Sequence, residues 1–226
     1  MDMTKAPLFC IIGKSGSGKS TICNELEKTL KLNQIPSYTT RKPRYENEKG
    51  HTFVSDSEFD KLEDIIAYAE TDGNRYAVTK SMLEDESYSL YVVDMTGWKM
   101  LQTDYVNKYE NTRPLISIYI DCDVVDRFNY MVNRQDTQAG LIPRALKRIE
   151  HDAVEFNQFD IENWIDVVVK NDINIDDLYS KVKQIIFNYF ERYHDAVIAP
   201  YLYYVIDDAK FYDISNTKLK ENMYND

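Results

Sequence analysis

The stretch FCIIGKSGSGKST, residues 9–21, joins an apolar run to a loop of glycine, serine and lysine. It fits the pattern G-x-x-x-x-G-K-[ST], in which Lys19 reaches the outer phosphates of a nucleoside triphosphate and Ser20 binds Mg²⁺. Glycine lets backbone N–H groups turn inward, and a loop of such groups before a helix N-terminus binds phosphate oxygens. The residues expected to contact ATP are Gly13, Lys14, Ser15, Gly16, Ser17, Gly18, Lys19, Ser20 and Thr21.

The residues on both sides of this loop support the same prediction. Residues 8–12 are short, continuous and apolar, as in a buried strand of a parallel sheet. After the loop, Ile22, Leu26 and Leu30 recur at four-residue spacing beside Cys23, which gives a helix one apolar face. Strand, loop and helix therefore follow in the order that the pattern requires, and this context disfavours an accidental match.

Three further apolar stretches predict the rest of an α/β fold. LYVVDM (90–95), LISIYID (115–121) and DVVVK (166–170) are typical of buried strands, and helical patterns separate them. Strands that alternate with helices indicate a parallel sheet with helices on both faces. Two polar segments interrupt this core: residues 33–89, with a basic cluster and then an acidic helix, and residues 123–160, which are strongly charged.

Composition limits the classes of function. The 226 residues suit one domain with insertions or an appendage, and a hydrophobic content of 43% excludes wholesale disorder. The net charge of −11 argues against nucleic acid or an anionic membrane as the main partner. Cys10, Cys23 and Cys122 are far apart and form no C-x-x-C pair. With no signal peptide or long apolar run evident, we expect a reducing cytoplasm, of a cell or of a virus's host.

A second candidate phosphate site follows the first helix closely. The stretch SYTTRKPR (37–44) places Arg41 and Arg44 three residues apart, with Pro43 stiffening the loop. Because the planar fork of arginine matches a phosphate bidentately, the two arginines can clamp a terminal phosphate, with Ser37 as a neutral donor. For an isolated R-x-x-R, a solvated basic loop would be the better interpretation.

At this point the chain resembles the guanylate kinases, which join a phosphate loop to a serine–threonine–arginine stretch much like SYTTRKPR. The similarity continues through GHTFVSDSEF (50–59), GNRYAV (73–78), YVVDMTG (91–97), NRQDT (133–137), ALKRIEHDAVEF (145–156) and DVVVKND (166–172). It covers residues 8 to about 190. The resemblance implies a P-loop nucleoside monophosphate kinase fold that transfers the γ-phosphoryl group of ATP, with Mg²⁺, to a nucleoside monophosphate such as GMP or dGMP.

The resemblance also implies a division of the chain and roles for its residues. The guanylate-kinase-like domain would span 1–190, with its core at 1–35, 90–122 and 160–190, a monophosphate-binding insertion at 36–89 and a lid at 123–159. Residues 191–226, with an apolar tyrosine-rich strip at 201–206, would form an extension, and the protein would be a monomer or a homodimer. The residues expected to act in catalysis are Lys19, Arg41, Arg134 and Arg148. Those expected to bind the acceptor are Ser37, Arg41, Arg44, His51, Tyr76, Asp94 and Thr96.

Departures from the family pattern cluster around the base. Ala67 stands where the family has a guanine-reading glutamate, Val78 where it has a serine, and Thr96 where it has an aspartate. His51 replaces a phosphate-binding tyrosine, and Lys14 a proline. Three interpretations stay open: another base, guanine read by other residues such as Glu70, Asp72 or Thr96, or a pocket without turnover. A kinase of another phosphorylated acceptor, such as ribose 1,5-bisphosphate, and a non-catalytic interaction module are the alternative functions.

Overall fold

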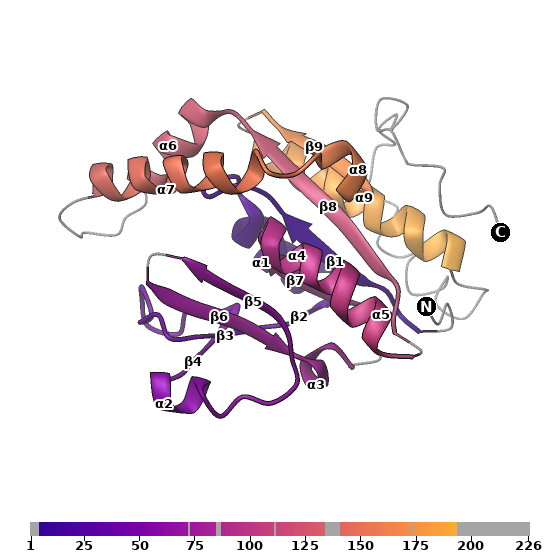
Figure 1. The fold of residues 1–226 in the computed structure, drawn as a ribbon. Coiled ribbons are helices and arrows are strands. Elements are labelled where there is room, and N and C mark those ends of the chain that lie inside the picture. The colour runs from indigo at the N-terminus through magenta and orange to yellow at the C-terminus, as the bar shows by residue number, and fades with distance from the viewer. Residues whose placement is uncertain are drawn as a thin grey trace.

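The computed structural model describes residues 5–71, 73–84, 87–110, 112–133, 141–172 and 174–193. Two sheets organise this part of the chain, a five-stranded sheet in the order β2-β7-β1-β8-β9 and a four-stranded sheet in the order β4-β3-β6-β5. Figure 1 shows the four-stranded sheet on one side of the five-stranded core and helices α6 and α7 on the other. Arg134, Asp72 and the strip at 201–206 lie outside the described residues.

The five-stranded sheet is wholly parallel, which confirms the predicted α/β class. Its strands are β1 (Leu8–Ile12), β2 (Asn33–Gln34), β7 (Ser89–Val93), β8 (Leu115–Cys122) and β9 (Val167–Asn171). The central strand β1 is buried on both faces, because Phe9 and Ile11 belong to one hydrophobic core while Leu8, Cys10 and Ile12 belong to a second. A continuous apolar run is what such a strand needs.

Helices cover both faces of this sheet (Figure 1). On the first face lie α1 (Lys19–Leu30) and α9 (Ile175–Tyr193), which bury Ile22, Leu26 and Leu178. On the second face lie α4 (Met95–Met100), the π-helical turn η1 (Leu101–Tyr105), α5 (Val106–Lys108) and α8 (Ile161–Trp164). The fully buried Trp98 of α4 anchors this second face and donates from its indole nitrogen to the carbonyl of Trp164 at 2.8 Å. Among the described helices, none combines the length and the apolar character that crossing a membrane requires.

The four-stranded sheet corrects one expectation. It contains β3 (Ser37–Thr39), β4 (His51–Phe53), β5 (Ile65–Thr71) and β6 (Asn74–Thr79), flanked by the short helices α2 (Asp56–Phe59) and α3 (Lys80–Leu83). The predicted acidic helix that would carry Glu70 is therefore wrong, since β5 and β6 form an antiparallel hairpin. The Asp-Gly pair at 72–73 is a hairpin turn signal, and Gly73 has the positive φ of +71° that such a turn uses.

Helices α6 (Val124–Val132) and α7 (Leu141–Phe156) pack against each other beyond the C-terminal end of β8. At its end, α7 returns to the core, where Phe156 joins the second hydrophobic cluster with Tyr119 and Trp98. One side of α7 thus faces the glycine loop and the four-stranded sheet. This arrangement sets the geometry of the site.

Candidate active site

The glycine loop, residues 13–20, leaves β1 and enters α1. Its backbone leaves no room for side chains at two points. A Cβ on Gly13 would come within 2.7 Å of the carbonyl oxygen of Ile120, and one on Gly16, at φ +80°, within 2.7 Å of the Arg127 carbonyl oxygen. Gly18 is the N-cap of α1 and supplies no side-chain cap, so the N–H groups of the first turn are available to an anion.

Lys19 bends back over this loop. Its Nζ donates to the carbonyl oxygens of Gly13 at 2.6 Å and Lys14 at 2.9 Å. Beside it, Asp94 ends β7 and caps α4, accepting from the backbone N–H of Gly97 at 2.7 Å. Burial raises the pKa of Asp94, while this hydrogen bond and the Lys19 charge oppose the rise. The loop cation and the strand-end carboxylate therefore lie within one small region.

Glu48 organises the two arginines of the predicted second phosphate site. The Arg41 guanidinium binds Glu48 bidentately, at 2.8 and 3.1 Å, and the Arg44 backbone N–H donates to the same carboxylate at 2.7 Å. Although burial opposes it, hydrogen bonding to Arg41 and Arg44 lowers the pKa of Glu48. Glu48 is not among the residues expected from the sequence, and because Glu46 lies in the same basic loop, the sequence alone does not single it out.

His51 lies against this arginine pair. Its Nδ1 is 2.8 Å from Ser37 Oγ, and its ring centroid is 5.8 Å from that of Tyr76. Burial, together with the positive charge of Arg41, lowers the pKa of His51 to about 4. His51 is therefore neutral at pH 7.

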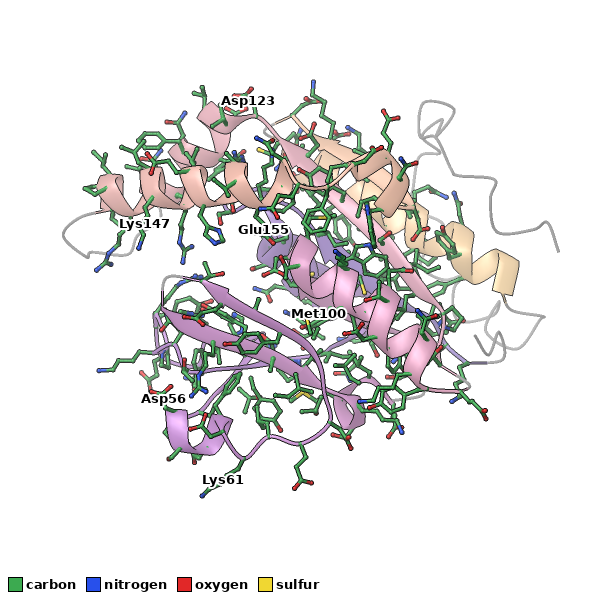
Figure 2. The ribbon with its side chains drawn as sticks, in the orientation of Figure 1. Asp56, Lys61, Met100, Asp123, Lys147 and Glu155 are labelled. Carbon is green, nitrogen blue, oxygen red and sulfur yellow. The ribbon has the colours of Figure 1, made fainter. Side chains whose placement is uncertain are left out.

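One cleft brings most of the expected residues together. We call the space between the glycine loop, the four-stranded sheet and α7 the transfer cleft; Figure 2 shows the side chains of α7 and of that sheet on opposite sides of it. The expected residues that line it are Gly13, Ser15, Gly16, Lys19, Ser20, Ser37, Arg44, His51, Tyr76, Asp94 and Arg148. The expected residues that are not part of the lining are Lys14, Ser17, Gly18, Thr21, Arg41 and Thr96, and Arg134 falls outside the described residues.

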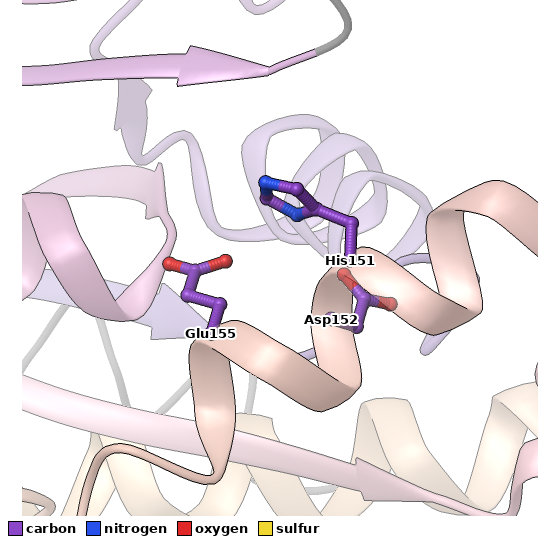
Figure 3. Close-up of side chains that lie close together, drawn as sticks. All are labelled: His151, Asp152 and Glu155. Atoms are coloured by element: carbon purple, nitrogen blue, oxygen red, sulfur yellow. The ribbon is translucent and has the colours of Figure 1, made fainter.

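Helix α7 contributes residues that the sequence analysis did not select. His151, Asp152 and Glu155 also line the transfer cleft, with ligand atoms that all lie within 4.8 Å of one another (Figure 3). Glu155 Oε1 accepts from the backbone N–H and hydroxyl of Thr96, at 3.2 and 3.1 Å. Burial and the nearby Asp94 raise the pKa of Glu155. Because Asp152 also binds protein donors, we assign no metal to this group.

A sequence profile described as guanylate kinase matches residues 5–189. The chain belongs to the guanylate kinase family. Among curated relatives, the guanylate kinase of Fusobacterium nucleatum is 36% identical over 88 residues, which are 37% of this chain and 48% of that protein. The guanylate kinase of Clostridium tetani is 35% identical over 113 residues, 46% of this chain and 54% of that protein. The chain thus spans about half the length of the curated relatives it matches.

The fold of a solved guanylate kinase matches more of the chain. The crystal structure of guanylate kinase from Anaplasma phagocytophilum superposes with a TM-score of 0.58 at 22% identity, covering 82% of this chain and 86% of that one. This likeness concerns the fold alone. It agrees with the P-loop nucleoside monophosphate kinase architecture that the resemblance implied.

Two residues at which the sequence analysis expects a departure from the family pattern, Ala67 and Val78, pair with each other across β5 and β6 in an apolar region. Ala67 is 2% exposed and Val78 is fully buried, and both belong to the second hydrophobic core. Ala67 Cβ lies 3.8 Å from where a Cβ on Gly97 would stand, so β5 packs directly on α4. Glu70 of β5 instead lies near the Tyr68 hydroxyl, at 3.3 Å, and is not part of the lining of the transfer cleft.

Proposed function

We propose that the protein is an ATP-dependent nucleoside monophosphate kinase, which transfers the γ-phosphoryl group of ATP to GMP, dGMP or a related (deoxy)nucleoside monophosphate and yields the diphosphate. One observation carries this proposal. The glycine loop with Lys19 and the cluster of Arg44, His51 and Tyr76 line the same cleft. Two facing sites for phosphate are what transfer between two phosphorylated molecules needs, because alignment of donor and acceptor supplies much of the rate.

The side chains of the cleft match the chemistry of phosphoryl transfer. The protein must hold two anions in line and neutralise the charge on the transferring oxygens, and no general base is required. Lys19 acts from the glycine loop, Arg44 from the loop between β3 and β4, and Arg148 from α7. Arg41, outside the lining, is joined to Arg44 through Glu48. Glu48 prearranges the two acceptor arginines side by side, so that less of their freedom is lost when a phosphate binds.

The glycine loop fits the phosphates of ATP. The Ser17 hydroxyl is buried, and no hydrogen-bond partner for its Oγ is found within the described residues. The first-turn N–H groups of α1 have no side-chain cap. The Ser20 hydroxyl lines the cleft as Asp94 does, and hydroxyl and carboxylate oxygens suit Mg²⁺. When bound with ATP, Mg²⁺ would neutralise charge on the phosphate oxygens, and Ser20 would hold it.

ADP formation tests this proposal directly. The protein, ATP and Mg²⁺ are combined with a panel of ribo- and deoxyribonucleoside monophosphates and with ribose 1,5-bisphosphate. We expect ADP production that depends on at least one nucleoside monophosphate. Turnover with ribose 1,5-bisphosphate alone would favour the alternative kinase. No acceptor-dependent ADP from a folded protein would favour a non-catalytic interaction module.

A further inference from the structure

A buried ion pair ties the glycine loop to helices α6 and α7. Asp152 of α7 accepts hydrogen bonds from both donors of Ser15, from the backbone N–H at 2.8 Å and from the hydroxyl at 3.1 Å. Arg127 of α6 donates from Nη1 to the same Asp152 carboxylate at 2.8 Å and to the Ser15 carbonyl oxygen at 3.3 Å. The Ser15 residue is therefore bonded at its N–H, its C=O and its side chain.

Both charged side chains are almost fully enclosed. Arg127 retains 5% and Asp152 7% of its side-chain exposure. Charges at such depth are tolerated only when they are paired and hydrogen-bonded, and hydrogen bonds to an ionised group are stronger than neutral ones. The pair therefore costs desolvation, and the bonds to Ser15 are among those that compensate for it. A purely apolar contact between loop and helix would avoid this cost.

The neighbouring residue shows how closely the helices and the loop pack. Gly16 has a φ of +80°, and a Cβ there would lie 2.7 Å from the Arg127 carbonyl oxygen and 3.2 Å from the Met131 Cγ. On the far side of the loop, the Asn171 side-chain amide donates to the Ser17 carbonyl oxygen at 3.0 Å. Helix α6 and the end of β9 thus fix the carbonyls of Ser15 and Ser17, while helix α7 fixes the Ser15 N–H and hydroxyl.

We propose that Asp152 is a positioning residue for the donor-phosphate loop. Through Ser15 it holds the first half of the loop in the conformation that receives phosphate, and Arg127 compensates its charge. Because the Ser15 N–H is committed to Asp152 and the Ser17 N–H donates to the Lys14 carbonyl oxygen at 3.2 Å, the ATP phosphates bind other N–H groups of the loop and of the first turn of α1. This inference rests on the proposed assignment of the loop to ATP.

Binding of ATP with Mg²⁺, measured by isothermal titration calorimetry, tests the proposal without an acceptor or turnover. We expect Asp152→Ala to raise the Kd for ATP at least tenfold. Ser15→Ala removes only the hydroxyl bond, so a smaller rise is expected. Asp152→Asn keeps the size and one acceptor oxygen, and its Kd should lie between that of the parent and that of Asp152→Ala. Glu150→Ala, which removes an exposed carboxylate of the same helix, should leave the Kd unchanged.

A merely structural role would give a different pattern. It would lower the melting temperature and the active fraction while the folded protein bound ATP as the parent does. A Kd within twofold of the parent value in folded Asp152→Ala overturns the positioning role and leaves the proposed function standing. If Asp152→Ala does not fold, the same criterion applies to Asp152→Asn and Ser15→Ala. A parent protein that binds no ATP would overturn the proposed function and this inference together.

Discussion

At the scale of single residues, His51 links the acceptor cluster to the pH dependence of stability. In the unfolded chain its pKa lies near 6.5, and in the folded protein burial and Arg41 lower it to about 4. The unfolded state therefore binds the proton more readily, so the contribution of His51 is full above pH 6.5 and is lost as the pH falls toward 4. At pH 5 the loss amounts to about 2 kcal/mol of unfolding free energy.

Replacement of this histidine by a group that does not titrate checks the prediction. His51→Gln keeps a hydrogen-bonding side chain of similar length, so its unfolding free energy should fall less than that of the parent between pH 7 and pH 5. Urea denaturation at both pH values measures the difference. Parallel losses in the two proteins would show that His51 is not held neutral by the fold.

Lys19→Ala tests the catalytic role of the glycine loop. Lys19 is only partly buried and lines the cleft rather than a hydrophobic core, so we expect Lys19→Ala to stay folded. Removal of a cation that acts on transferring phosphates costs about 10²–10³ in kcat for groups of this kind. Lys28→Ala, which removes an exposed lysine of the same helix, serves as the control. Activity of Lys19→Ala within tenfold of the parent would contradict a catalytic role for the loop.

At the scale of elements, the four-stranded sheet and α7 are expected to affect different kinetic constants. Arg41→Ala and Arg44→Ala should raise the KM for the acceptor far more than the KM for ATP, because a bidentate arginine contributes binding as well as alignment. Arg148→Ala should chiefly lower kcat, since cations on a closing element act on the transferring group. Initial rates with each substrate varied in turn separate these effects.

A third arginine of the same sheet provides the control. Arg75 of β6 binds Asp56 at 2.7 Å and Asp60 at 2.6 Å, on the α2 side of the sheet and outside the cleft lining. Arg75→Ala should therefore leave both KM values close to those of the parent. If the Arg41 and Arg44 variants weakened only ATP binding, the cluster would belong to the donor site.

The elements also show why sequence patterns predict some structures better than others. The glycine loop is local, since strand, turn and helix follow within about twenty residues and each has its own signal. The sequence pattern predicts an acidic helix where the structure has the β5–β6 hairpin, although the Asp-Gly pair at 72–73 is a hairpin signal. Its strand character also depends on packing: Ile66, Ala67 and Val78 are buried against α4, and that tertiary contact overrides local propensity.

At the scale of the whole molecule, the contacts that could not be predicted join distant parts of the chain. Ser15 and Asp152 are 137 residues apart, and Ser15 and Arg127 are 112 apart. Spacing along the sequence carries no signal for such pairs. From the sequence alone, Arg127 and Asp152 are indistinguishable from solvated charges on helices. The transfer cleft itself was predictable, because its glycine loop and its arginine cluster each have a short motif. The contacts that hold the glycine loop in place, from Asp152 and Arg127 to Ser15, were not predictable.

If the proposed function holds, the base of the acceptor would lie in the part of the transfer cleft that Ala67 lines. A pocket built to pair with guanine rejects other bases by about 10⁴–10⁵, because an unpaired buried partner is costly. Here Ala67 contributes apolar surface to the cleft lining, Val78 is fully buried behind it, Glu70 is outside the lining, and Thr96 already donates to Glu155. We therefore expect the ratio of kcat/KM for GMP or dGMP over other monophosphates to fall below this range, or another base to be preferred. Ala67→Glu should raise the preference for guanine, while Glu70→Gln should not change it. A guanine preference of full strength that persists in Thr96→Ala would contradict this account of the pocket.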